Sequence, residues 1–548
     1  MFVNSKYFQI LNKIFSKLDL HTIKLVRFVS QEWSEIGASC IGRQIILDPY
    51  DVFLPKSSEL VENPGTVFTF NPRLARRINM HDSYYWPARK PHNLPVDKIA
   101  AMLSLFSTHI NQFTTQVEFF VQKATCQKYV TALLTRNEFP CLKSISVTVE
   151  EDVFHVIDDE YRMEIDPLPV RPSIKSITYK LDPLVNCIVA NTFPFRGVFN
   201  AMLASAPNLQ KVSIVDNFYP NLENCRALDS LKLVGSLITQ KPLVGLHGLG
   251  GYSYIFGKDD AFEEKKFLRT ILQVQKTLRH LVIGAGPEDT PFGWNPSSIP
   301  DTATDYRLPL LPNLESLEIL GFGCFDKIGE TLNSIILPRM KYISLVETEL
   351  GSTTMDQILA KVKPDNRAVE ELSLQFLRDP EAFHRFGVLW PNVKKLTVSF
   401  KGKYRLAASL NYAVIIQSLS NCWDKLDQFH VKLQLSCYEW GTFCSEAVKS
   451  LAKFSGVKSI DVQSSVIPDF YYREAAVYPV DWDFLLLTKT FNSFTFRDTE
   501  FTIPTLEGIV RLREAHQLPI QFNKCQASRQ GFSWATTLTI PLDKWVDF

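Results

Sequence analysis

The chain has 548 residues, several times the usual length of one domain, and 45% of them are hydrophobic, so we expect more than one structural unit. Lysine plus arginine (59) nearly balances aspartate plus glutamate (58), which argues against nucleic acid or an anionic membrane as a partner. No apolar run approaches the roughly eighteen residues that a membrane-spanning helix needs.

The ten cysteines are scattered and form no C-x-x-C pair, which predicts reduced, buried cysteines. The N-terminal stretch MFVNSKYFQILNKIFSKLDL carries Lys6, Lys13 and Lys17 among its apolar residues. It therefore does not have the uninterrupted apolar core of a signal peptide. Together these features predict a cytoplasmic or nuclear protein.

The first forty residues have the pattern of short amphipathic helices. In FQILNKIFSKLDL the apolar residues fall on one helix face, at Ile10, Leu11, Ile14, Phe15 and Leu18. Asp19 is a typical N-cap and predicts a second helix, with apolar residues Ile23, Leu25, Val26, Phe28 and Val29, followed one and two turns later by Trp33 and Ile36. Three such helices bury too little surface to be stable alone, so we expect them to pack on the rest of the chain or on a partner.

The stretch ILNKIFSKLDLHTIKLVRFVSQEW resembles the F-box motif. That motif has an apolar pair, an Ile-Phe followed by a Leu, a helix with an Arg and a Val two residues later, and a Trp four residues after the Val. The matching residues here are Ile10, Leu11, Ile14, Phe15, Leu18, Ile23, Leu25, Arg27, Val29 and Trp33. The family's opening Leu-Pro dipeptide is replaced by SKYFQ.

F-box segments bind the Skp adaptor of cullin-RING ubiquitin ligases. The resemblance therefore implies a Skp-type adaptor and a cullin scaffold as partners, with adaptor-binding residues Ile10, Leu11, Ile14, Phe15, Leu18, Leu25, Val29 and Trp33. In the alternative interpretation these helices only cap a larger domain. Their apolar face should then be buried against the strand that we expect at 45–47.

One pattern recurs between about 139 and 500: an aliphatic residue at position 0, two polar residues, an aliphatic residue at +3, one further residue and an aliphatic residue at +5. It occurs eleven times, in PCLKSISV, PSIKSITY, PNLQKVSI, RALDSLKL, KTLRHLVI, PNLESLEI, PRMKYISL, RAVEELSL, PNVKKLTV, DKLDQFHV and SGVKSIDV, with a weaker copy in FNSFTF. Each copy predicts a short parallel strand that points these residues into a shared core, after a turn set by Pro or Asn.

The segments between the copies have helical periodicity: GVFNAMLASA, KKFLRTILQVQ, TMDQILAKV, AASLNYAVIIQSL and CSEAVKSLAKF. Strands and helices that alternate in this way resemble the leucine-rich-repeat family. Only Asn217 and Cys324 are plausible instances of the family's Asn or Cys after the strand. The alternative is an ordinary α/β domain with similar strands.

The predicted fold is therefore α/β: a short three-helix F-box-like unit followed by an irregular leucine-rich-repeat solenoid, with parallel strands on the concave face and helices on the convex face. We expect the F-box-like unit at 1–42, a linking strand and helices at 43–135, the solenoid at 136–500 and a C-terminal cap at 501–548. We interpret residues 60–125, including the helical stretch DKIAAMLSLFS, as a link rather than a binding patch. Residues 468–484 fit an insertion loop or part of the cap.

Side chains at +2, +4 and +6 of each copy should point away from the core, because strand side chains alternate. Many of them are serine or threonine. The larger ones are Lys211, Lys232, His280, Glu318, Tyr342, Glu371, Lys395, His430, Lys432 and Asp461. Because both charge signs occur, this face fits a polypeptide target better than a nucleic acid.

Signatures of enzyme chemistry are missing from the sequence. It contains no G-x-S-x-G, no G-x-x-x-x-G-K-[ST], no H-E-x-x-H and no Cys or His pair at metal spacing. The glycines of GLHGLGGY at 245–252 and GFGCFDKIG at 321–329 are more typical of turns than of nucleotide loops. We therefore expect no cofactor, no metal and no catalytic residues.

The leading hypothesis is a non-catalytic substrate-recognition subunit of an SCF-type ubiquitin ligase, with the repeats holding an unidentified protein target. The second hypothesis is a leucine-rich-repeat scaffold outside any ligase.

Overall fold

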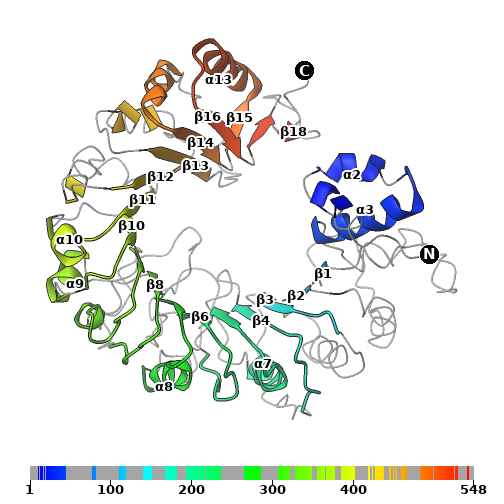
Figure 1. Cartoon of the computed structure of the whole chain (residues 1–548), viewed down its shortest axis with the longest axis vertical. Coiled ribbons are helices and arrows are strands. Elements are labelled where there is room, and N and C mark those ends of the chain that lie inside the picture. The colour runs from blue at the N-terminus through cyan, green and yellow to red at the C-terminus, as the bar shows by residue number, and fades with distance from the viewer. Residues whose placement is uncertain are drawn as a thin grey trace, which may run out of the picture. The chain divides into compact units, whose positions relative to one another are not determined.

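The computed structural model describes residues within 10–44, 77–81, 110–118, 140–150, 167–181, 193–235, 264–285, 307–320, 327–347, 355–376, 384–401, 418–436, 444–452, 458–465, 482–528 and 540–541, with short gaps inside several ranges. The chain divides into two compact units, residues 1–278 with 286–298, and residues 279–285 with 299–548. Figure 1 colours the described residues by their position in the chain.

Parallel strands in chain order form the sheet of each unit. In the first unit the described strands are β1 Arg77–His81, β2 Gln112–Glu118, β3 Ser144–Glu150, β4 Ser176–Leu181, β5 Lys211–Val215 and β6 Ser230–Gly235. In the second unit they are β7 His280–Ala285, β8 Ser316–Leu320, β9 Tyr342–Val346, β10 Glu371–Phe376, β11 Lys395–Lys401, β12 Gln428–Ser436, β13 Ser459–Ser465, β14 Ser493–Arg497 and β16 Ile520–Asn523. Every copy of the repeat pattern, the weaker one included, supplies one of these strands.

Helices connect many of the strands. In the first unit they are α7 Phe193–Ser205 and α8 Glu264–Val274. In the second unit they are the short helix η5 Ile328–Thr331, α9 Met355–Lys361, α10 His384–Leu389, η7 Trp482–Thr490 and α13 Ile503–His516. Helices α7, α8 and α9 fall where the periodicity predicted them. The coarse prediction, an α/β fold with repeated parallel strands and helices, is thus confirmed.

A proline turn introduces several of the strands. The backbone N–H of Leu209 donates to the carbonyl of Ala206 (3.2 Å), and that of Leu314 donates to Leu311 (3.3 Å). A proline follows the accepting residue in each case, and proline favours this second position of a β-turn because its ring fixes φ. The recurring Pro-Asn of the sequence is therefore the turn that sets the start of the strand.

Hydrogen bonds at the strand entrances tie successive repeats together. The carbonyl of Lys341 accepts hydrogen bonds from the N–H groups of Glu370 (2.9 Å) and Glu371 (3.0 Å). The same pattern, two successive N–H groups on one carbonyl, recurs between other neighbouring strands. The side-chain amides of Asn208 and Asn392 donate across the repeat boundary to the carbonyls of Pro172 (3.1 Å) and Arg367 (2.8 Å). These asparagines precede the strand. Asn217 and Cys324, which follow strands, lie outside the described residues.

The residues at positions 0, +3 and +5 of the repeats point into the core. In the repeat that contains β10, for example, Val369 before the strand and Leu372 and Leu374 within it are all 0% exposed. In the first unit, Tyr179 of β4 packs edge-on against Phe199 of α7, with ring centroids 5.5 Å apart. Helices therefore cover one face of the strands, and the residues that alternate with the core residues point to the other.

Three strands of these sheets were not anticipated from the sequence. The segment expected to link the helices to the solenoid contributes β1 and β2, and the expected cap contributes β16. By register, Thr115 of β2 stands at +5 and Gln517 stands at position 0 before β16, so a polar residue interrupts the apolar pattern in both. These strands therefore form by pairing with a neighbouring strand, without the complete apolar pattern.

Gln517 also ends α13. It has a positive φ of 52°, and the N–H of Leu518 donates to the carbonyl of Arg513 (3.0 Å), as in a Schellman C-cap. A small second sheet follows in the same region: β15 Glu500–Thr502 pairs in parallel with β17 Gln526–Ser528, which pairs antiparallel with β18 Ile540–Pro541.

The register of the repeats slips by two residues between β12 and β13. Position +2 of β11, Lys395, faces +2 of β12, Gln428. Across the next joint, however, +4 of β12, His430, faces +2 of β13, Ser459. A two-residue slip keeps every side chain on its face, so the core stays apolar while outward residues gain different neighbours.

Several expected features lie outside the described residues: the strand at 45–47, the helix of DKIAAMLSLFS, the glycines at 245–252 and most of 468–484.

Candidate protein-binding surfaces

The N-terminal residues form short helices in the first unit. Ile10, Leu11 and residues 13–15 are helical, and two further helices follow, α2 Leu20–Val26 and α3 Gln31–Gln44. The prediction of one helix running through Val29 to Trp33 was wrong. Ser30 interrupts it, because its hydroxyl accepts the N–H of Trp33 (3.2 Å) and caps α3.

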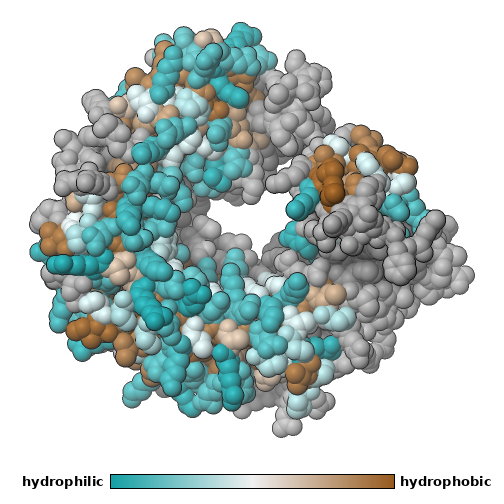
Figure 2. Space-filling view, viewed as in Figure 1, coloured by the Kyte–Doolittle hydropathy of each residue, from teal (hydrophilic) through white to brown (hydrophobic). Residues whose placement is uncertain are grey.

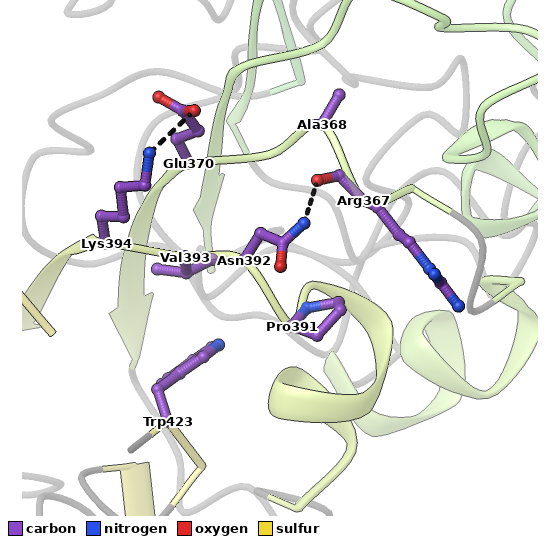
Figure 3. Close-up of a pocket in the computed structure, with 8 residues that line it drawn as sticks. All are labelled: Arg367, Ala368, Glu370, Pro391, Asn392, Val393, Lys394 and Trp423. Carbon is purple, nitrogen blue, oxygen red and sulfur yellow. Dashed lines mark hydrogen bonds and ion pairs between the residues drawn. The ribbon is translucent and has the colours of Figure 1, made fainter. Parts of the chain in front are cut away.

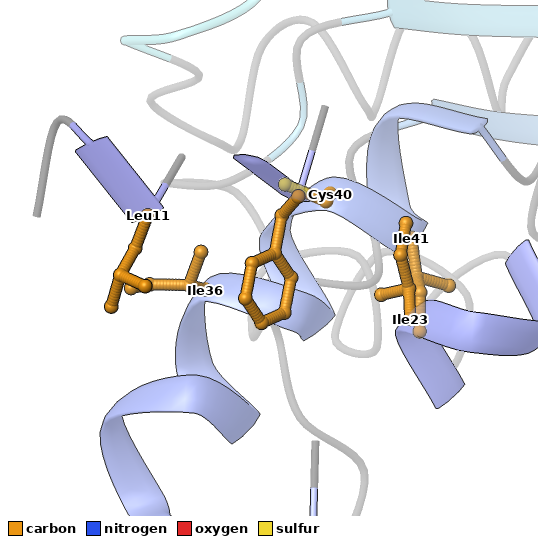
Figure 4. Close-up of a cluster of buried hydrophobic side chains, with 6 residues drawn as sticks. Leu11, Ile23, Ile36, Cys40 and Ile41 are labelled. Atoms are coloured by element: carbon orange, nitrogen blue, oxygen red, sulfur yellow. The ribbon is translucent and has the colours of Figure 1, made fainter. Parts of the chain in front are cut away.

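A small apolar core joins these helices (Figure 4). Its buried members are Leu11, Phe15, Ile23, Ile36, Cys40 and Ile41, with Leu18, Val26 and Trp33 packed against them. Trp33 lies edge-on to Phe15, with ring centroids 5.4 Å apart. Edge-to-face geometry of this kind is favourable, so the Trp33 side chain helps to hold α3 against the first helical residues.

Other apolar side chains of the first helical residues, of α2 and of the turn between α2 and α3 remain exposed. They are Ile10 (56%), Ile14 (48%), Leu25 (58%), Phe28 (89%) and Val29 (65%), and we call them the apolar helical residues. Figure 2 shows hydrophobic surface over this part of the molecule. Gathered exposed aliphatic and aromatic side chains are unusual on a free surface and commonly mark a contact site.

The eight residues predicted to bind an adaptor therefore have different environments. Leu11 and Phe15 are buried (4% and 0% exposed), and Leu18 and Trp33 are half-buried in the same core. Ile10, Ile14, Leu25 and Val29 are exposed. Phe28, which was not in the predicted set, is the most exposed of all. Its spacing three residues after Leu25 was the sequence signal for it, and the structure places it in the turn after α2.

The second candidate surface is the outward face of the strands. All ten residues predicted for it lie on strands at outward positions, and each is exposed or half-buried. Lys211 and Lys232 belong to β5 and β6 of the first unit. The other eight belong to the second unit, on β7 to β13.

Tyr342 lies on β9 between two acidic neighbours. The hydroxyl groups of Ser344 and Ser373 hydrogen-bond to its phenol, and Glu318 and Glu371 interact with it electrostatically. Burial raises the pKa of Tyr342, and the two carboxylates raise it further. The side chain is therefore a neutral, positioned aromatic group between acidic residues.

Polar side chains lie close together on β12 to β14, beside the two-residue register slip between β12 and β13. The imidazole Nδ1 of His430 hydrogen-bonds to Ser459, and Arg497 forms an ion pair with Asp461 (3.1 Å). Burial lowers the pKa of His430, and nearby Lys432 and Lys395 lower it while Asp461 and Glu371 raise it. Arg497 was not predicted, although it stands at the outward +6 position of the weaker repeat copy.

A pocket of about 450 Å³ lies where β10 and β11 begin (Figure 3). Its lining already contains internal bonds: Asn392 donates to the carbonyl of Arg367 (2.8 Å), and Lys394 pairs with Glu370 (3.1 Å). Trp423, also in the lining, donates its indole N–H to the carbonyl of Trp390 (2.8 Å). These bonds join repeats, so the pocket is part of the repeat framework.

Among the described residues, no group of three or more His, Cys, Asp or Glu side chains could hold a metal ion. None of the described helices has both the length and the apolar character needed to span a membrane. No protein-family model matches the chain, and a search of curated proteins finds no match.

Proposed function

We propose that this protein is the substrate-recognition subunit of an SCF-type, cullin-RING ubiquitin ligase. Its N-terminal helices would bind a Skp-type adaptor, and its repeat strands would bind the target protein. The observation that carries the proposal is the set of exposed apolar helical residues, which stand beside an F-box-like pattern whose remaining apolar residues form a compact core.

The arrangement divides the work between two kinds of residue. Leu11, Phe15 and Trp33 hold the helices to one another, whereas Leu25, Phe28 and Val29 present apolar area to a partner. When a partner covers such side chains, burial of their apolar surface contributes a free energy of roughly 25 cal/mol per Å², before the costs of association are subtracted.

Such a subunit needs no catalytic residues of its own. It would hold the target close to the ubiquitin-transfer module and so raise the effective concentration of the target's lysines there.

The alternative function is a repeat scaffold whose N-terminal helices only cap the first strands. A cap should bury its apolar face within the chain. The exposure of Ile14, Leu25 and Phe28 favours the adaptor-binding function over this alternative.

Co-purification of the intact chain with a recombinant Skp adaptor tests the proposal. We expect a complex with the intact chain and its loss when Ile14→Asp and Leu25→Asp are combined. Both side chains are exposed (48% and 58%), so the charges should not disturb folding. Trp33→Ala should weaken binding indirectly, by loosening the helical core.

The control is Ile335→Asp, which charges a still more exposed isoleucine (72%) in the second unit. It should co-purify like the intact chain. Absence of a complex with the intact chain would remove the ligase function and leave the scaffold.

A further inference from the structure

The outward face of the second unit changes the sign of its charge along the strand order. On β8, β9 and β10 the charged outward residues are Glu318 and Glu371, with Tyr342 between them, and no lysine or arginine is among them. On β11 to β14 the described outward side chains include Lys395, Lys432 and Arg497 against the single Asp461. One half of the face is thus acidic and the other half basic.

The charges where the halves meet are not neutralised by each other. Glu371 and Lys395 are direct cross-strand partners, yet no ion pair joins them, and within the described part of the chain Lys432 makes none either. Asp461, by contrast, is paired with Arg497. Lys395 and Lys432 are both exposed, so their ammonium groups can meet an external anion without breaking an internal bond.

We propose that this face binds one extended polypeptide segment with separated charges, basic where it meets Glu318 and Glu371 and acidic where it meets Lys395 and Lys432. Tyr342 would contact the segment between the carboxylates, because half-buried tyrosines often anchor interfaces. The inference rests on the proposed function, since it describes the target that the ligase subunit would hold.

The two charge signs select a polypeptide over a nucleic acid. A nucleic-acid strand would meet Lys395 and Lys432 favourably but would be repelled by the acidic strands beside them. A uniformly acidic peptide meets the same obstacle. Only a segment that carries both signs is complementary to the whole face.

Strand geometry sets the spacing of the charges. The centre of the acidic half is β9 and that of the basic half is β12, three strand spacings of about 4.8 Å apart. This distance of about 14 Å is spanned by about four residues of extended chain. The expected segment therefore has its basic and acidic groups about four residues apart.

The test uses fluorescence anisotropy with the full chain and synthetic labelled peptides at low ionic strength. The bipolar peptide carries three Lys, one Gly and three Glu, so that the centres of its basic and acidic groups lie four residues apart. Its control has the same composition with Lys and Glu alternating. An all-Glu peptide and a single-stranded oligonucleotide complete the set.

We expect the bipolar peptide to bind at least about tenfold more tightly than the others, with an affinity that falls as salt is added. Combining Lys395→Glu with Lys432→Glu should abolish this preference. Adding Glu318→Lys and Glu371→Lys to that variant should restore it, because the reversed face accepts the peptide in the opposite direction. Lys211→Glu, an exposed outward lysine on β5 of the first unit, should change nothing.

No detectable binding of the bipolar peptide would overturn the inference. So would equal binding by the alternating peptide, the all-Glu peptide or the oligonucleotide, or failure of the reversed variant to recover. The assay contains no adaptor, and all of these variants should still co-purify with it. Loss of adaptor binding by the intact chain would therefore count against the ligase function, whereas loss of peptide preference alone counts against this surface.

Discussion

The N-terminal helices and the repeat strands use the same kinds of apolar side chain in opposite ways. In the repeats, Leu372, Leu374 and their equivalents on other strands are almost fully buried. In the N-terminal helical region, Leu25 of α2 and Phe28 and Val29 of the turn that follows it are more than half exposed. Burial in the repeats stabilises the fold, whereas exposure in the helices leaves free energy to be gained by binding a partner.

The largest expected difference between the two regions is in the effect of replacing leucine with alanine. Leu372→Ala on β10, at 0% exposure, should lower the free energy of unfolding of the second unit by about 2–5 kcal/mol, because it leaves a cavity between packed strands. Leu25→Ala, at 58% exposure, should change stability by less than about 0.5 kcal/mol while it weakens adaptor binding. Urea denaturation measures the first quantity and titration calorimetry the second. Equal destabilisation by the two variants would erase the distinction.

A smaller effect is expected from close packing in the helices that cover the strands. A Cβ added at Gly387 of α10 would lie 2.4 Å from the carbonyl oxygen of Cys422, so Gly387→Ala should cost about 1–3 kcal/mol through displacement of backbone.

The control for that substitution is Gly508→Ala in α13, where an added Cβ meets nothing within 4 Å. Alanine should stabilise this helix by roughly 0.5–1 kcal/mol, since glycine loses more backbone entropy. Thermal unfolding of both variants should shift in opposite directions. A gain of stability from Gly387→Ala would show that the helix packs less tightly than described.

The smallest effect concerns pH. The Arg279 side chain, helped by Lys341, lowers the pKa of Glu315 below its usual 4.5. A carboxyl with a lowered folded-state pKa adds stability that is complete above its unfolded pKa and is lost as pH falls through the folded value. The stability difference between the intact chain and Glu315→Gln should therefore be constant near neutral pH and shrink below about pH 4.5. A difference that grows on acidification would contradict this sign.

The repeat strands were predictable because their apolar residues at 0, +3 and +5 report a backbone periodicity and a buried face together. Strands β2 and β16 were missed because Thr115 and Gln517 interrupt that pattern. Strand β1 has apolar Ile78 and Met80 at +3 and +5 and was missed because its segment was interpreted as a link. The outward-facing residues were predictable from the alternation of strand side chains alone. Their cross-strand neighbours were not predictable, because a two-residue register slip such as that beside His430 leaves the alternation unchanged.

In the N-terminal helices the sequence identified the apolar residues but not their division between core and surface. Phe28 and Val29 continue the apolar spacing of α2, so the break before Ser30 was hidden. The division between buried Phe15 and exposed Ile14 depends on how the helices cross, which spacing within one helix does not specify.

The central claim, that the exposed apolar helical residues bind a Skp-type adaptor, is tested most directly by adaptor affinity for two matched variants. Val29→Asp and Val388→Asp charge valines of nearly equal exposure, 65% and 62%, in the turn after α2 and on α10 of the second unit. We predict that Val29→Asp weakens adaptor binding at least about tenfold, a loss of about 1.4 kcal/mol, and that Val388→Asp leaves it unchanged. Equal affinities for the two variants, or no measurable affinity of the intact chain, would contradict the claim.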